Sequence, residues 1–317
     1  MRVLIYGGGS VGLGLASCLI RTGSEVDIIA RADTVAALRN DGLVRTGIFG
    51  DVRIEPARFR AGSGMEELSG GPYDQVLVCT KSFDSEPAAQ DLAQHEARIG
   101  RQAVFVLFQN GWGNVDAFTA HFDRARVYSA RVITGFHRHR PNEVEITVHA
   151  DAIHIGSLFG AELSGMEPLC RAIEEGGIPC RRTDAIEKDL WAKMLYNCAL
   201  NPLGAILGVP YGGLAAQAST RSLMNHIIRE VFAVMSAAGY RTHWEEPEAF
   251  LDAFYSRLVP DTAGHRSSTL QDLAAGKRTE IDALNGAVIR LAEEQGVRVP
   301  HNHAVYSLIK FLESNGR

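Results

Sequence analysis

VLIYGGGSVGLG, residues 3–14, runs from a short apolar strand directly into the start of a helix. Its glycines follow the pattern Gly7-x-Gly9-x-x-Gly12. The first permits a tight turn, the second lets a pyrophosphate approach the backbone, and the third lets helix and strand pack closely. Backbone N–H groups at the helix N-terminus attract phosphate. The stretch therefore predicts a dinucleotide-binding loop, with a glycine-rich turn without ligand as the alternative. The expected contacts are Gly7, Gly8, Gly9, Ser10, Val11 and Gly12.

The first 110 residues alternate between compact apolar runs and helical stretches. Strands that alternate with helices form a parallel sheet covered on its faces, the doubly wound α/β arrangement. Two further β-rich runs, 126–136 and 143–156, flank the polar turn HRHRPN and are expected to add antiparallel strands at the edge of the same sheet. The four predicted parallel strands are RVLIY (2–6), EVDIIA (25–30), QVLVCT (75–80) and AVFVLF (103–108).

Strand patterns nearly vanish after Thr183, and the rest of the chain is predicted to be helical. Thr183 and Asp184 are good N-cap candidates, so we expect a domain boundary there. The prediction is a Rossmann-type nucleotide-binding domain over residues 1–182 and an all-helical domain over 183–317. The expected helices cover 184–201, 218–238, 246–258, 267–275, 280–296 and 302–314.

Length and composition suit two ordinary globular domains, with 317 residues of which 46% are apolar and 22% charged. The formal charge of −5 comes without a basic run or basic amphipathic helix, which argues against general affinity for nucleic acid or an anionic membrane. Glycines interrupt the apolar N-terminus, and no apolar span reaches about 18 residues. We therefore expect a soluble protein without a targeting signal.

The cysteines and histidines indicate the redox environment of the protein and whether it binds a metal ion. The five cysteines are odd in number and form no Cys-x-x-Cys pair, which favours a reduced, cytoplasmic location. His137 and His139 flank an arginine in a turn, and His301 and His303 follow Pro300 at a helix start. Neither pair comes with the Cys, Asp or Glu ligands of a metal site, so surface or capping roles are expected and no metal is predicted.

Three polar residues follow predicted strands, at the edge where open α/β sheets bind ligands. Arg31 stands where an acidic residue would bind the ribose of NAD, and Asp33 is expected to cap the next helix. A guanidinium can clamp a 2′-phosphate, so NADP(H) is the predicted cofactor; the alternative is a solvated surface arginine.

Lys81 is expected near the cofactor phosphate or ribose, and Asn110 where nicotinamide and substrate meet. Simple exposure of Lys81 and an Asn-Gly turn at Asn110 are the ordinary alternatives.

KMLYNCALN, residues 193–201, sets Lys193, Asn197 and Asn201 four apart on a helix whose other faces are apolar. A buried ammonium is costly unless it is paired or functional. The three side chains suit a 2-oxo acid, because amides bind its oxygens and the ammonium polarises its carbonyl. An equally weighted alternative is a solvent-facing stripe on an amphipathic helix.

SSTLQDLAAGKRTEIDALNG, residues 267–286, predicts two helices, the second capped by Thr279. Ser268 and Glu280 would lie in the first turns of these helices, where negative charge and anions are favoured. On the pattern alone, Ser267 or Ser268 and Glu280 are capping residues.

Together these motifs resemble the ketopantoate reductase (2-dehydropantoate 2-reductase) family. The resemblance extends from the first strand to GVRVPHN near the end, and its two C-terminal motifs are far more specific than the glycine loop. Members reduce 2-dehydropantoate to (R)-pantoate with NADPH, a step toward pantothenate and coenzyme A, and their helical domain is similar to that of 6-phosphogluconate dehydrogenase. The motifs are GGGSVG from residue 7, Arg31, CTK, QNG, KDLWAKMLYNCALNPLGAILGVPYG (188–212) and the 267–286 stretch.

The resemblance implies a role for each residue of the predicted site. The implied reaction is hydride delivery from nicotinamide C4 to the ketone carbon of a 2-oxo acid, while Lys193 stabilises and protonates the oxygen. Where some members have Pro-Asn-Gly, this chain has Pro210-Tyr211-Gly212, which leaves the fit of the distal part of the substrate open. The implied roles are catalysis for Lys193 and Glu280, substrate binding for Asn110, Asn197, Asn201 and Ser268, and cofactor binding for Arg31, Lys81, Asn110 and Glu280.

Two other interpretations stay open. The first is a reductase of another bulky 2-oxo acid, because Tyr211 alters a pocket contact. A catalytically silent dinucleotide sensor is the second, although Lys193, Asn197, Asn201 and Glu280 together argue against it. The sequence is silent on oligomeric state, although helical domains of this kind often pair as homodimers.

Overall fold

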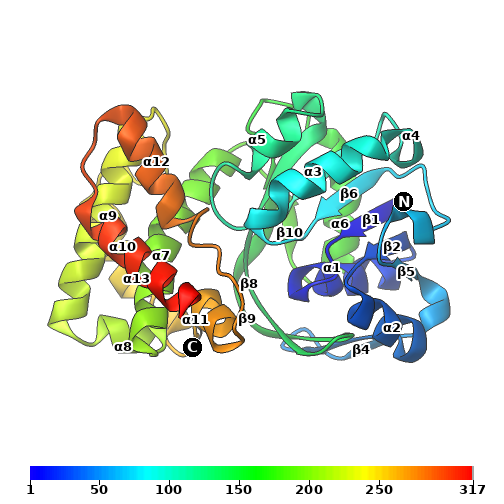
Figure 1. Ribbon diagram of the computed structural model, residues 1–317, viewed down its shortest axis with the longest axis horizontal. Helices are drawn as coiled ribbons and strands as arrows, with labels where there is room; N and C mark the ends of the chain where they lie inside the picture. The colour runs from blue at the N-terminus through cyan, green and yellow to red at the C-terminus, as the bar shows by residue number, and fades with distance from the viewer. Residues whose placement is uncertain (316–317) are drawn as a thin grey trace. The chain divides into compact units, whose positions relative to one another are not determined.

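The computed structural model describes residues 1–315 and consists of two compact units (Figure 1). Unit 1 comprises Met1–Gln109 and Asn114–Ile186, and unit 2 comprises Asn110–Gly113 and the chain from Glu187 onward. The interruption in sequence order is important for the site, because the segment Asn110–Gly113 follows a strand of unit 1 and yet is part of unit 2.

Unit 1 is built on one mixed sheet. Within residues 1–315 the sheet has ten strands in the order β4-β3-β9-β8-β7-β6-β1-β2-β5, with β10 paired to β9. The β3/β4 and β8/β9 pairs are antiparallel, and the other neighbours are parallel. The strands are β1 (Arg2–Tyr6), β2 (Glu25–Ile29), β3 (Leu43–Gly47), β4 (Val52–Ile54), β5 (Arg60–Gly62), β6 (Gln75–Val78), β7 (Val104–Leu107), β8 (Val127–Arg140), β9 (Glu143–Gly156) and β10 (Cys180–Arg182).

Helices cover both faces of this sheet, as predicted. Successive side chains of a strand point to opposite faces. Val3 and Ile5 of β1 therefore pack in one core with α1, α2 and α6, whereas Leu4 packs in a second core with α3, α4 and α5 (Figure 1). The helices are α1 (Ser10–Arg21), α2 (Ala32–Asp41), α3 (Ser85–Gln94), α4 (Glu96–Ile99), α5 (Asn114–Thr119) and α6 (Glu167–Glu175).

The predicted β-hairpin is present, but it is longer than expected and lies inside the sheet. Pairing of β8 with β9 continues to Arg140 and Glu143, so the turn falls at Pro141 and Asn142, and the prediction of a turn over 137–142 is wrong in its first part. The predicted edge position is also wrong, because β3 and β4 extend the sheet beyond β9. Strands β3, β4, β5 and β10 escaped prediction because their sequences, LVRTG, VRI, RAG and CRR, contain arginine and form no compact apolar run.

Unit 2 is helical, as predicted, but α7 continues past its predicted end at residue 201 to Leu207, α8 (Tyr211–Ala215) escaped prediction, and two helix starts differ. α7 begins at Ile186, so Thr183 and Asp184 are not its N-cap. α12 begins at Asn285, so the predicted helix start at Thr279 is wrong. Within residues 1–315, no helix has both the length and the apolar composition needed to cross a bilayer. The helices are α7 (Ile186–Leu207), α8 (Tyr211–Ala215), α9 (Ala218–Ala237), α10 (Pro247–Ala253), α11 (Ser268–Ala274), α12 (Asn285–Gln295) and α13 (Pro300–Ser314).

The long helix α7 contains Pro202 in its interior. Proline has no N–H group, so the carbonyl one turn earlier, that of Cys198, loses its usual helical donor. Asn285 Nδ2 donates to that carbonyl oxygen at 3.0 Å and also to Asn302 Oδ1 at 3.0 Å. Both asparagines are completely buried, so this network ties α7 to α12 and α13 at the level of the asparagine stripe.

Candidate active site

Two glycines of the loop in unit 1 are required by the fold itself. Gly7 has φ +116°, and a Cβ there would lie 2.7 Å from the backbone of Cys79 and Thr80. A Cβ on Gly12 would lie 2.1 Å from the carbonyl oxygen of Gly7. A side chain at either position would displace the β1–α1 turn from the end of β6.

Gly9 is different, because nothing in the protein requires a glycine there. Its φ of −82° and ψ of −169° suit any residue, and a Cβ would meet no atom within 4 Å. Gly9 is the N-cap of α1, and no side chain caps this helix. The helix N-terminus therefore opens onto clear space, which fits the approach of a dinucleotide phosphate to the backbone.

Arg31 lies just beyond β2 and is exposed. It is the N-cap residue of α2, so the prediction that Asp33 caps this helix is wrong; Asp33 lies in its first turn. Sequence reasoning missed a second cation here, Arg138 of β8. Burial lowers the pKa of Arg138, the Asp33 carboxylate raises it and the Arg31 guanidinium lowers it, so Arg138 lies within electrostatic range of both groups. Arg138 also donates to the hydroxyl of Thr34.

Lys81 lies beyond the carboxyl end of β6, as predicted, and is half-buried. Gln109, just beyond the neighbouring strand β7, forms hydrogen bonds with the segment that follows β6. Its Nε2 donates to Lys81 O at 3.2 Å, to Thr80 Oγ1 at 3.2 Å and to Ser85 Oγ at 2.9 Å. Gln109 therefore fixes the backbone that carries Lys81.

The segment Asn110–Gly113 is fastened within unit 2 by its backbone and by one aromatic side chain. Gly111 has φ +91°, and a Cβ there would lie 2.4 Å from Ala283 O. Trp112 N donates to the same oxygen at 2.9 Å. The Trp112 ring packs with its centroid 4.7 Å from those of Trp191 and of Tyr240. These contacts hold Asn110 at a fixed position beside α7.

Lys193, Asn110 and Glu280 form a chain of hydrogen bonds. Lys193 Nζ donates to Asn110 Oδ1 at 2.5 Å, and Asn110 Nδ2 donates to Glu280 Oε2 at 3.0 Å. Both bonds involve an ionisable group, and such charge-assisted bonds are the stronger kind. Glu280 is only 6% exposed, so its carboxylate and the ammonium are coupled in a region of reduced solvent access.

Glu280 is held by a turn and not by the predicted helix. Thr279 N and Thr279 Oγ1 both donate to Glu313 Oε1 at 2.7 Å. Lys310 Nζ lies 2.8 Å from the other oxygen of Glu313 and 3.3 Å from Asp282. This network on α13 satisfies both donors of Thr279 and holds the turn that carries Glu280.

Asn197 and Asn201 are buried, at 7% and 4% exposed, so the alternative of a solvent-facing stripe is wrong for them. Lys193 is half-buried. Within residues 1–315 neither amide atom of Asn197 has a hydrogen-bond partner. The amide atoms of Asn197 are not among the fully buried, unpaired polar atoms of residues 1–315, so they keep access to water or a ligand.

Ser267, and not Ser268, is the N-cap of α11. Ser267 Oγ accepts from Leu270 N at 3.1 Å and donates to Asn201 O at 3.1 Å. It thereby fastens the start of α11 to the asparagine stripe of α7. Ser268 is the first residue of α11 and is half-buried.

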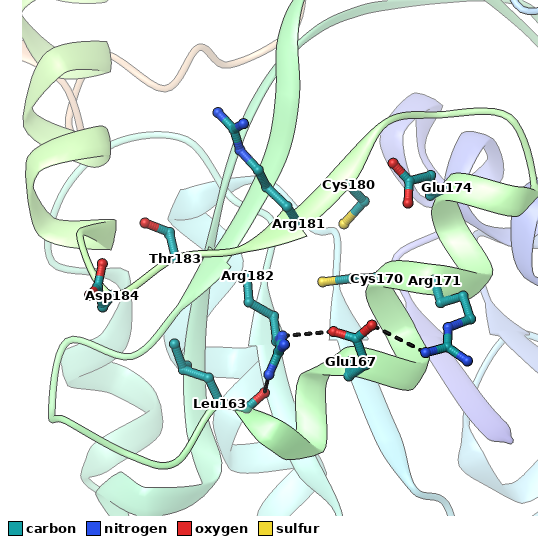
Figure 2. A pocket seen from close by; sticks show the side chains of 10 residues that line it. All are labelled: Leu163, Glu167, Cys170, Arg171, Glu174, Cys180, Arg181, Arg182, Thr183 and Asp184. Atoms are coloured by element: carbon teal, nitrogen blue, oxygen red, sulfur yellow. Dashed lines mark hydrogen bonds and ion pairs between the residues drawn. The ribbon is translucent and has the colours of Figure 1, made fainter.

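A separate surface pocket of about 600 Å³ lies in unit 1, where α6 faces β10 (Figure 2). Its charges neutralise one another, because Glu167 pairs with Arg182 at 2.8 Å and with Arg171 at 3.3 Å. Cys170 and Cys180 line it as free thiols. No predicted site residue lines this pocket. In the described part of the chain, no three His, Cys, Asp or Glu side chains are grouped so as to hold a metal ion.

The structure divides the predicted residues into two groups. The loop Gly7–Gly12, Arg31 and Lys81 lie in unit 1, whereas Lys193, Asn197, Asn201, Asn110, Glu280 and Ser268 lie in unit 2. Sequence reasoning missed the supporting residues Gln109, Trp112, Arg138 and Glu313. The tryptophan between two glycines in NGWGN was a signal for Trp112; the others have partners far away in the sequence and leave no local pattern.

A glycine loop on a doubly wound sheet, followed by a helical unit with an ammonium, amide and carboxylate cluster, defines the class of a Rossmann-type oxidoreductase. The family model described as "Ketopantoate reductase PanE/ApbA" matches residues 3–160. The family model described as "Ketopantoate reductase PanE/ApbA C terminal" matches residues 185–313. The chain therefore belongs to the ketopantoate reductase family, nicotinamide-dependent oxidoreductases that act on CH–OH and C=O groups. The resemblance drawn from the motifs is confirmed.

Relatives of similar length support this assignment. The 2-dehydropantoate 2-reductase of Aquifex aeolicus is 34% identical over 314 residues, covering 99% of this chain and 97% of the relative. The crystal structure of a PanE/ApbA family ketopantoate reductase from Ralstonia eutropha JMP134 is 30% identical with a TM-score of 0.86, covering 100% and 99%. A D-mandelate dehydrogenase with NADH and anilino(oxo)acetate shares the fold, at 22% identity and a TM-score of 0.88 over 99% of each chain.

Substitution of Gly9 and of Gly7 by alanine should separate binding from folding. Gly9→Ala should leave the urea unfolding midpoint unchanged but weaken binding of the nicotinamide dinucleotide at least about tenfold, because only a bound phosphate needs the space above Gly9. Gly7→Ala should lower the free energy of unfolding by about 1–3 kcal/mol, because φ +116° is strained for alanine. Fluorescence titration and urea unfolding measure the two effects. Unchanged affinity of Gly9→Ala for the nicotinamide dinucleotide would contradict the phosphate-loop assignment.

Proposed function

We propose that this protein reduces 2-dehydropantoate to (R)-pantoate with NADPH. The observation that carries the proposal is the Lys193 ammonium held 2.5 Å from the Asn110 amide oxygen, on the same helical stripe as the buried, unpaired amide of Asn197. The names of full-length relatives, at up to 34% identity, supply the substrate.

The chemistry of unit 2 suits a 2-oxo acid. Its carboxylate and keto oxygens only accept hydrogen bonds, and the stripe offers an ammonium and two amides to donate them. Lys193 would face the keto oxygen, stabilise the negative charge that develops there and donate the proton. Glu280, coupled to Lys193 through Asn110, would keep the ammonium charged and aimed.

The cofactor assignment rests on unit 1. The loop Gly7–Gly12 would hold the pyrophosphate, and Arg31, with Arg138 beside it, would hold a 2′-phosphate. Lys81 would lie near the phosphate or ribose. When bound, the nicotinamide supplies the hydride that C4 delivers to the ketone carbon. Cytoplasmic location and pairing into a homodimer stay predictions.

A panel of 2-oxo acids assayed with NADPH tests the function directly. We expect 2-dehydropantoate to give the highest kcat/KM, followed by the decrease in NADPH absorbance. A clear preference for another bulky 2-oxo acid would favour the alternative that rests on Tyr211. Tight NADPH binding without oxidation by any member of the panel would favour a dinucleotide sensor.

Lys193→Ala should lower kcat at least about a hundredfold while NADPH affinity changes by less than about twofold, because the general acid is lost and the phosphate loop is intact. Lys188→Ala is the matched control, since Lys188 is an exposed lysine of the same helix. Steady-state kinetics and NADPH titration measure both quantities. Near-normal turnover in Lys193→Ala would remove Lys193 from its role.

Arg31→Ala should raise the KM for NADPH much more than the KM for NADH, by at least about tenfold, because only NADPH carries the 2′-phosphate. Arg101→Ala, which changes an exposed arginine elsewhere in unit 1, is the control. Equal losses for both cofactors would defeat the 2′-phosphate assignment.

A further inference from the structure

Tyr211 lies at the start of α8, only 3% exposed, and its ring is fixed by its neighbours. The Tyr196 and His265 rings have their centroids 5.6 Å and 5.3 Å from its own. Tyr211 N also donates to His265 O at 3.1 Å. These contacts hold the phenol ring of Tyr211 in place.

The Tyr211 hydroxyl donates to Asn201 Oδ1 at 2.7 Å. Burial raises the pKa of Tyr211 well above its usual value, so the phenol keeps its proton. Within residues 1–315 the Tyr211 hydroxyl makes no other hydrogen bond. A buried O–H group needs an acceptor, so the amide oxygen, and not the amide nitrogen, must face it.

This contact fixes which way the Asn201 amide points. The backbone carbonyl of Asn201 accepts from Ser267 Oγ at 3.1 Å, and its side-chain oxygen accepts from Tyr211. The remaining polar group is Nδ2, which has no hydrogen-bond partner within the described residues. Asn197 has no such tether, so its amide is free to present either its oxygen or its nitrogen.

We propose that Tyr211 is a positioning and specificity-determining residue, which makes Asn201 a donor-only subsite that selects an oxygen acceptor such as the carboxylate or keto oxygen of a 2-oxo acid. The identity of the ligand rests on the proposed function; the orientation of the amide does not. Asn197 is then the adaptable member of the pair and suits a hydroxyl, which both donates and accepts.

Tyr211→Phe removes the hydroxyl and keeps the ring. The amide can then turn, so KM for the preferred 2-oxo acid should rise about five- to tenfold while kcat changes by less than about twofold. Tyr196→Phe is the matched control, because Tyr196 is a neighbouring tyrosine whose hydroxyl bonds Thr262 and not Asn201. Thermal unfolding of both variants checks that any change in KM is not a loss of fold.

A double-mutant cycle isolates the path through Asn201. In the Asn201→Ala background, Tyr211→Phe should produce no further change in kcat/KM, because the group it positions is absent. An equal loss in both backgrounds would overturn the proposal, since Tyr211 would then act by packing alone. An unchanged KM in Tyr211→Phe would also overturn it.

An orientation readout independent of turnover uses protein labelled with ¹⁵N-asparagine. The Asn201 side-chain resonance, assigned by its loss in Asn201→Ala, should shift in Tyr211→Phe and stay in place in Tyr196→Phe. No shift in Tyr211→Phe would overturn the proposal. A shift together with an Asn201→Ala variant that reduces its substrate normally would keep the tether but overturn the specificity role, and would remove Asn201 from the proposed substrate site.

Discussion

The Asn110 amide stands between an ammonium and a carboxylate, and the chemistry of unit 2 depends on this arrangement. Its oxygen accepts from Lys193 at 2.5 Å and its nitrogen donates to Glu280 at 3.0 Å. A half turn of the amide would set NH₂ against the ammonium and the oxygen against the carboxylate, so the two charges fix its orientation. The amide therefore couples the ammonium and the carboxylate through these two hydrogen bonds.

Several segments that are distant in the sequence must pack together before this chain of hydrogen bonds can form. Gly111 lets the backbone pass against Ala283, and Trp112 packs between aromatic rings of unit 2. Glu313 satisfies both donors of Thr279 and so presents Glu280 from a turn. The free energy of packing and of ordinary hydrogen bonds thus positions the charged groups, which by themselves would be better solvated in water.

The two asparagines of α7 differ although they occupy equivalent places on one stripe. Asn201 is tethered at its oxygen by Tyr211, whereas Asn197 has no partner in the described residues. One amide is therefore a fixed donor and the other adapts to what it meets. Pro202, one residue beyond Asn201, removes a helical hydrogen bond, and Asn285 of α12 donates to the carbonyl oxygen that would otherwise lack a partner.

The sequence by itself determined the doubly wound unit, the helical unit, the glycine loop and the stripe of Lys193, Asn197 and Asn201, because each depends on periodicity or on spacing within a few residues. It did not determine the turn at Glu280, the interior position of the β8/β9 hairpin or the partners Gln109, Arg138 and Glu313. Only the tertiary structure decided that Tyr211 orients Asn201 and leaves Asn197 free. The physical reason is that a hydrogen bond depends on distance and direction in space, and those are set by packing between segments that no local pattern connects.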